Sequence, residues 1–143
     1  MTDTTKLAER IEALEGPCRE MDAEIFKAVG APLPKAAFGM DIELQPDPNS
    51  ASGFVMPVGE LQVRYECPAY TASLDAAMTL VPEGWAHGYR WNAKYKSAYA
   101  WCDFIPEAPF KPEELLSQHS RKCATPALAL LAAALRAQEA HNG

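Results

Sequence analysis

The chain has 143 residues, of which 48% are hydrophobic and 22% are charged. These values suit one folded domain, residues 1–143, that needs neither a metal ion nor a disulfide to fold. The net charge of -6 disfavours binding of nucleic-acid polymers, and the most apolar run is far shorter than a membrane span. The four cysteines form no C-x-x-C pair and follow no signal peptide, which predicts free thiols in a reducing cytoplasm.

Two amphipathic helices are predicted at the start of the chain, separated by Gly16 and Pro17. Glycine favours the exit from one helix, and proline favours the first position of the next. The apolar face of the first helix, which Asp3 or Thr4 can cap, consists of Leu7, Ile11 and Leu14. The apolar face of the second helix, which ends at Gly30, consists of Cys18, Met21, Ile25 and Val29.

Residues 31–59 contain five prolines and predict long connections. Short edge strands are expected at Phe38–Leu44 and Gly53–Val58, whereas proline, which has no amide hydrogen, argues against a central strand there. Leu61, Val63 and Tyr65 then alternate with polar residues, which is typical of a half-buried strand.

Ser73 is predicted to cap a third helix, which the sequence Pro82-Glu83-Gly84 should end. The buried face of this helix is expected to be Leu74, Ala77, Met78 and Val81. A hairpin is expected to follow from Trp85 to Phe104, with its turn near residues 92–94.

The last third predicts a proline-rich loop at residues 106–112, a short helix at Pro112–His119, and a final helix. Thr125 and Pro126 supply the cap and the first position of that final helix. Its inner face should hold Leu128, Leu131 and Leu135, while Leu130 and many alanines predict burial on more than one side. The order of elements favours an α+β fold in which helices pack on an antiparallel or mixed sheet.

Three groups of residues resemble the phage ABA-sandwich domain, a family of small phage and prophage proteins. The groups are RIEALEGP at 10–17 with REMDA at 19–23, PAYTASLDAA at 68–77 with LVPEGW at 80–85, and ATPALAL at 124–130 with AALRA at 133–137. The resemblance implies a sheet between two helical layers, an αβα sandwich, and implies no reaction. Some small phage proteins of this size sequester nucleotide-derived immune signals, so by analogy the resemblance suggests a defence antagonist in the host cytoplasm.

The predicted hairpin carries aromatic residues at odd positions and polar or basic residues at most even ones. The odd positions hold Trp85, His87, Tyr89, Trp91, Tyr95, Tyr99 and Trp101. Odd positions share a face of a strand, although the turn can reset this alternation between the two halves. The aromatic residues are interpreted either as core beneath the helices or as a stacking platform for a base or another flat ligand.

The basic residues near this hairpin are interpreted either as a solvated surface or as a clamp for phosphate. The predicted ligand-binding residues are Arg64, Arg90, Trp91, Lys94, Tyr95 and Lys96. The preferred hypothesis is a non-enzymatic phage accessory protein that sequesters an anionic nucleotide-derived signal, and a site shared within a homo-oligomer is compatible with it. The alternative is a protein-interaction module that inhibits a host protein or serves a phage assembly.

No catalytic residue, cofactor or metal site is predicted. His119 and Cys123 would lie on one side of a helix, but two ligands are too few for a zinc site. His87 and Cys102 could form a nucleophilic pair only if both were on one face of the hairpin, and their parity predicts opposite faces. Asp103 is interpreted as a solvated charge.

Overall fold

The computed structural model describes residues 3–30, 45–46, 53–58 and 61–142. The sequence predicts one domain, and the chain divides into two compact units, each of which is described by itself. The main unit comprises Met1–Cys18 and Tyr70–Gly143, and the small unit comprises Arg19–Ala69. The strand predicted at Phe38–Leu44 and the side chain of the predicted cap Asp3 lie outside the described part.

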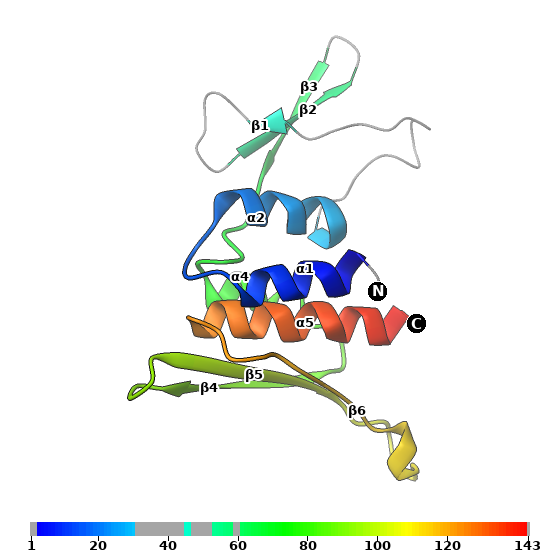
Figure 1. The fold of residues 1–143 in the computed structure, drawn as a ribbon. Coiled ribbons are helices and arrows are strands. Elements are labelled where there is room, and N and C mark those ends of the chain that lie inside the picture. Colours follow the sequence, from blue (N-terminus) through cyan, green and yellow to red (C-terminus); the bar gives the residue numbers. More distant parts are fainter. Residues whose placement is uncertain (1–2, 31–44, 47–52, 59–60, 143) are drawn as a thin grey trace. The chain divides into compact units, whose positions relative to one another are not determined.

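The main unit combines helices with one antiparallel sheet of strand order β4-β5-β6. Its elements in chain order are α1 (Asp3–Glu12), α4 (Leu74–Met78), β4 (Ala86–Asn92), β5 (Ser97–Phe104), the 3-10 turn η2 (Pro112–Glu114), β6 (Leu116–His119) and α5 (Pro126–Asn142) (Figure 1). The α+β class and the antiparallel sheet are therefore confirmed.

Helix α5 is the middle layer of the main unit, with the sheet on one side and α1 and α4 on the other (Figure 1). Its side chains from Leu128 to Leu135 are all buried, which confirms the expected burial on more than one side. Leucine and alanine side chains occupy every side of this helix over residues 128–135, so each side can pack against apolar neighbours. The resemblance implies a sheet in the middle layer, whereas in this unit a helix occupies that layer.

The predicted helix caps at Ser73 and Thr125 are confirmed. Ser73 Oγ accepts a hydrogen bond from the Ala76 amide, and Thr125 Oγ1 accepts one from the Leu128 amide, each at 3.2 Å. Each cap gives a partner to an amide that has none within the first helical turn.

Helices α4 and α1 end earlier than the sequence predicts. Helix α4 stops at Met78 because Thr79 Oγ1 donates a hydrogen bond to the Ala76 carbonyl at 2.6 Å and competes with the helical backbone. Met78, the last residue of α4, is exposed. In the following turn Leu80 is buried, whereas Val81 is only half-buried. Helix α1 likewise ends at Glu12, so Leu14 lies beyond it and is half-buried.

The prediction of a short helix at Pro112–His119 is wrong. Only Pro112–Glu114 is helical, as a 3-10 turn, and Leu116–His119 forms strand β6 against the edge of β5. Pairing with a strand that lies before it in the chain outweighs the weak local preference of these residues for helix.

A bidentate ion pair between Glu12 and Arg136 ties α1 to α5. The Arg136 guanidinium donates to both Glu12 oxygens at 2.6 Å, and also donates to the His119 carbonyl at 3.0 Å. Glu12 Oε2 accepts a further hydrogen bond from the Arg121 amide. Both side chains are shielded from solvent, so this cluster fixes the end of β6 to the two helices.

The small unit combines a helical segment with a second antiparallel sheet. Its elements are α2 (Arg19–Ile25), the π-helix η1 (Phe26–Gly30), β1 (Gln45–Pro46), β2 (Gly53–Val58) and β3 (Leu61–Glu66). Met21 and Ile25 are buried, and the helical segment ends at Gly30, as predicted.

Strand β2 is the central strand of the small unit, and the prediction that proline excludes a central strand is wrong. Within residues 45–46, 53–58 and 61–66, strand β1 pairs with Phe54 and Val55, whereas Pro57 is paired with β3 alone. Among these described residues, proline therefore lies beyond the part of β2 that is paired on both sides. The predicted strand at Leu61–Glu66 is confirmed, while its predicted half-burial concerns side chains outside the described part.

Candidate functional site

The predicted hairpin is confirmed as β4 and β5, joined by a turn at residues 93–96. Asn92 Oδ1 shapes this turn by accepting hydrogen bonds from the amides of Lys94 and Tyr95, at 3.1 and 3.2 Å. Lys96 closes the turn in the left-handed backbone region, with φ of 48°.

The turn resets the alternation, so odd positions of β4 and odd positions of β5 lie on opposite faces of the sheet. Tyr89 is paired with Ala100, and Arg90 with Tyr99, and directly paired residues share a face. Ala98 and Ala100 are buried on the face that packs against α5, which we call the inner face. The opposite face, the outer face, carries Gly88, Arg90, Tyr99, Trp101, Asp103, Ser117 and His119. The aromatic residues that the sequence places on one face therefore lie on two faces, those of β4 on the inner face and those of β5 at odd positions on the outer face.

The predicted ligand-binding residues do not converge on one side of the hairpin. Arg90 is on the outer face, whereas Trp91 follows it on the inner side of the edge strand and is 44% exposed. Lys94, Tyr95 and Lys96 lie in the turn, where the Lys94 ammonium is 5.3 Å from the centre of the Tyr95 ring. The side chain of Arg64, in β3 of the small unit, lies outside the described part.

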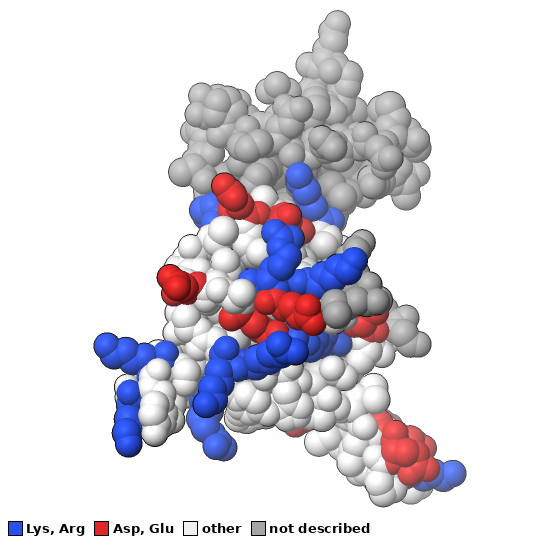
Figure 2. Space-filling model, viewed as in Figure 1, with Lys and Arg blue, Asp and Glu red and all other residues white. Residues whose placement is uncertain are grey.

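Positive charge gathers at the tip of the hairpin. Arg90, Lys94 and Lys96 are all exposed there, and Tyr95 is 67% exposed. Figure 2 shows lysine and arginine side chains around the hairpin tip, with no acidic side chain among them on the visible side. An acidic protein thus presents a local basic surface next to aromatic rings.

Aromatic rings form a continuous platform on the outer face. The Trp101 indole lies over Gly88, where an added Cβ would come within 2.4 Å of Trp101 Cζ2. The Tyr99 ring centre is 6.0 Å from that of Trp101 and 5.6 Å from that of His119, and the His119 ring is stacked on it at 27°. The sequence reveals neither Gly88 nor His119 as part of a site, because both join it through strand pairing.

A chain of hydrogen bonds crosses the outer face beside these rings. Asp103 Oδ1 is 2.6 Å from Ser117 Oγ, Ser117 Oγ is 2.8 Å from His119 Nε2, and His119 Nδ1 meets the Tyr99 hydroxyl. An ionised carboxylate can only accept, so Ser117 donates to Asp103 and accepts from His119 Nε2–H. When the imidazole carries a single proton, at Nε2, its Nδ1 accepts the Tyr99 hydroxyl proton. In this arrangement the hydroxyl of Ser117 is held by Asp103 and is not activated by His119.

The expectation that His87 and Cys102 lie on opposite faces is wrong, since the register pairs them directly. Burial, and the nearby charge of Asp103, raise the pKa of the Cys102 thiol to about 12. A thiol that is fully buried and protonated is a packing group rather than a nucleophile.

The sequence places His119 and Cys123 on one side of a helix, and the structure does not. His119 ends strand β6, and Cys123 bridges to Ala98, so the two do not share a helix. Within residues 3–30, 45–46, 53–58 and 61–142, no group of three histidine, cysteine or acidic side chains could hold a metal ion.

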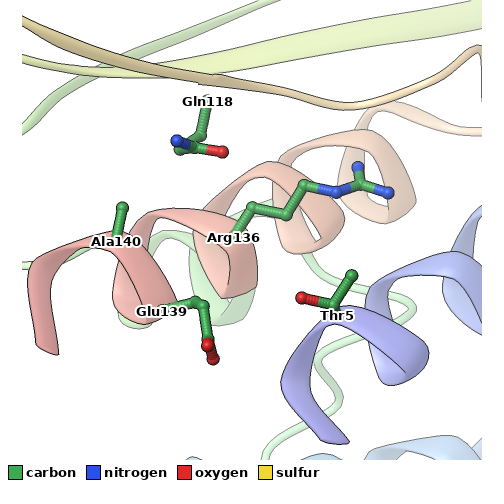
Figure 3. Close-up of a pocket in the computed structure, with 5 residues that line it drawn as sticks. All are labelled: Thr5, Gln118, Arg136, Glu139 and Ala140. Carbon is green, nitrogen blue, oxygen red and sulfur yellow. The ribbon is translucent and has the colours of Figure 1, made fainter. Parts of the chain in front are cut away.

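A cavity of about 310 Å³ lies between α1, β6 and α5 (Figure 3). Its lining residues are Thr5, Gln118, Arg136, Glu139 and Ala140. Figure 3 shows the Arg136 side chain extending away from Glu139, and its guanidinium is engaged by Glu12 and the His119 carbonyl. The cation of this cavity therefore serves the ion pair that joins the helices.

Comparisons with protein-family models, with curated proteins and with solved structures find no match to this chain. The resemblance to the phage ABA-sandwich domain therefore stays a prediction from the residues. Among the helices of the described part, none has the length and apolar character needed to cross a membrane.

Proposed function

We propose that this chain is a non-enzymatic binding protein that captures an anionic nucleotide-derived signal on hairpin β4–β5. The observation that carries the proposal is the combination of exposed aromatic rings with a cluster of cations that has no acidic side chain among them on the side seen in Figure 2. Tyr95 and Tyr99 are exposed beside Arg90, Lys94 and Lys96. Every base has a π-face that can stack on such rings, and phosphate oxygens pair well with guanidinium and ammonium groups.

The overall charge supports a small anion rather than a polymer as the ligand. A long nucleic acid would meet the net charge of -6, whereas a small anion would meet only the basic hairpin tip. In the phage or prophage setting that the resemblance implies, the protein would act as a defence antagonist in the host cytoplasm.

Thermal unfolding with a panel of nucleotides tests this function. A ligand at a hundred times its dissociation constant stabilises the folded state by about 2.7 kcal/mol, so the melting temperature should rise by several degrees for cyclic or ADP-ribose-type nucleotides. The double variant Lys94→Gln with Lys96→Gln should weaken the effect, while Lys111→Gln, which removes a charge outside the hairpin, should not. Absence of any shift across the panel, and of any small molecule released on denaturation, would contradict the proposal.

A second candidate function is a protein-interaction module, and the inner side of β4 favours it. Tyr89 and Trp91 are 46% and 44% exposed on this edge strand, and tyrosine and tryptophan are enriched among residues that dominate protein interfaces. Affinity capture from a host lysate should then recover a stoichiometric protein with the wild-type chain but not with Trp91→Ala. Equal recovery by both chains would contradict this candidate.

A further inference from the structure

We infer that the outer face of the β4–β5–β6 sheet is a mononucleotide site, in which the base stacks on Trp101 and the phosphate binds Arg90. This inference rests on the proposed function and names the site and the binding mode. It differs from the residues that the sequence suggests, because Trp91 lies on the inner side and only Arg90 is shared.

The orientation of Trp101 favours stacking of a flat ligand. Its indole occupies the space that a side chain at position 88 would fill, as the 2.4, 2.7 and 3.1 Å approaches of its ring atoms to an added Cβ show. Glycine in the middle of a strand weakens that strand, and it often marks a place of close approach. Here Gly88 allows the half-exposed Trp101 indole to lie against the sheet, so that a flat ligand can stack on the ring.

The aromatic platform continues beyond Trp101. Tyr99 and His119 extend the ring surface of Trp101, with tilts of 36° between Tyr99 and Trp101 and 27° between Tyr99 and His119. The hydrogen bond between the Tyr99 hydroxyl and His119 Nδ1 holds these two rings together. Rings fixed in this way lose little conformational freedom when a ligand binds.

The two ends of the platform carry side chains of opposite charge. Arg90 is paired with Tyr99 at one end, and Asp103 lies past Trp101 at the other. A phosphate would be repelled by Asp103 and attracted by Arg90, so the charges fix the direction of an anionic ligand. Positions 88 and 90 are about 7 Å apart along the strand, so the Trp101 ring over Gly88 and the Arg90 side chain are neighbours on the outer face.

The site favours a ligand that has both a flat base and a phosphate. A bare phosphate would gain only the exposed Arg90, and a neutral flat molecule or sugar would gain only the rings. Stacking is worth about 1–3 kcal/mol per base, a factor of about 5 to 150, so a ligand that combines stacking with a charge-assisted contact should bind at least about fivefold better than either part alone.

The experiment measures binding to the full-length chain by titration calorimetry and tryptophan fluorescence, with ADP as the probe. Adenosine and ribose 5-phosphate serve as the two half-ligands, and each should bind at least about fivefold more weakly than ADP. Gly88→Ala, which displaces the Trp101 ring, and Arg90→Gln should each weaken ADP binding at least about fivefold. The matched charge control Lys111→Gln should change it less than twofold.

The outcomes separate the site from the function. Gly88→Ala can disturb the sheet, so Trp101→Phe, which keeps a smaller ring, is included and should weaken ADP binding about three- to tenfold. If ADP or another nucleotide of the panel binds the wild type but Gly88→Ala, Trp101→Phe and Arg90→Gln bind it equally well, the site is wrong and the proposed function stands. If no nucleotide binds the wild type, both are wrong. Equal binding of ADP and a neutral sugar would overturn the nucleotide assignment.

Discussion

At the scale of single residues, the outer face depends on what one position lacks. Gly88 has no side chain, and the Trp101 indole fills the vacant space on the sheet. Neighbouring residues on the inner face show the opposite case, since Ala98, Ala100 and Cys102 are small side chains buried under α5. On strand β5, small residues thus face the core, and the larger aromatic rings stay accessible to a ligand.

The cysteines permit a test at this scale. Burial raises the pKa of Cys102 to about 12 and those of Cys67 and Cys123 to about 11, whereas Cys18 is only half-buried. A raised thiol pKa disfavours the reactive thiolate at every pH below it. At pH 8 a thiol reagent should therefore modify native Cys18 first, and all four thiols after denaturation.

Mass spectrometry of the labelled protein over time checks this order, with Cys18→Ser as the control that should remove the fast phase. Labelling of Cys102 in the native protein as fast as Cys18 would show that α5 does not cover it.

At the scale of elements, the turn of the hairpin contains a residue in an unfavourable conformation. Lys96 has φ of 48°, a region that costs a residue with a Cβ about 1 kcal/mol and costs glycine little. Lys96→Gly should therefore raise the free energy of unfolding by roughly 0.5 kcal/mol, because the larger entropy of glycine in the unfolded chain offsets part of the gain.

Urea unfolding measures this change. Lys94→Gly is the matched control, because it removes the same side chain from the same turn at a position without a positive φ, and it should lower stability or leave it unchanged. A destabilised Lys96→Gly would contradict the argument.

Elements with local signals could be predicted from the sequence, and elements that depend on distant partners could not. The caps at Ser73 and Thr125 and the hairpin are each encoded within a few neighbouring residues, and all are present. Strand β6 has no such local code, since it exists by pairing with β5. Because β6 cannot be predicted, the sequence does not assign His119 to the site. Arg90 and the aromatic residues of the hairpin, in contrast, can be recognised from the sequence.

At the scale of the whole main unit, the ion pair of Glu12 and Arg136 joins elements that are far apart in sequence. Burial alone would raise the pKa of Glu12, but the hydrogen bonds from Arg136 and the Arg121 amide, with their charges, hold it below its ordinary value of 4.5. A lowered folded-state pKa stabilises the fold above the unfolded-state value, and this contribution is lost as the pH falls through the lowered value.

Glu12→Gln should therefore destabilise the main unit by roughly 3 kcal/mol at pH 7, because it leaves the shielded Arg136 without its counter-charge. The difference from the wild type should shrink as the pH falls below 4.5, the ordinary value for this carboxyl. Urea unfolding at pH 7 and at pH 3 measures both effects. Glu15→Gln is the control, since Glu15 is exposed and should show neither. A pH-independent penalty for Glu12→Gln would assign the effect to packing instead.

The central place of α5 also has a consequence for the order of events during synthesis. The middle layer of the main unit is helix α5, residues 126–142. Helices α1 and α4 and the three strands are synthesised earlier, and all of them contact α5. A ribosome that adds about 5–20 residues per second would complete those earlier segments seconds before α5 emerges. Until then their apolar faces stay open to chaperones, so the main unit should fold late and as a whole.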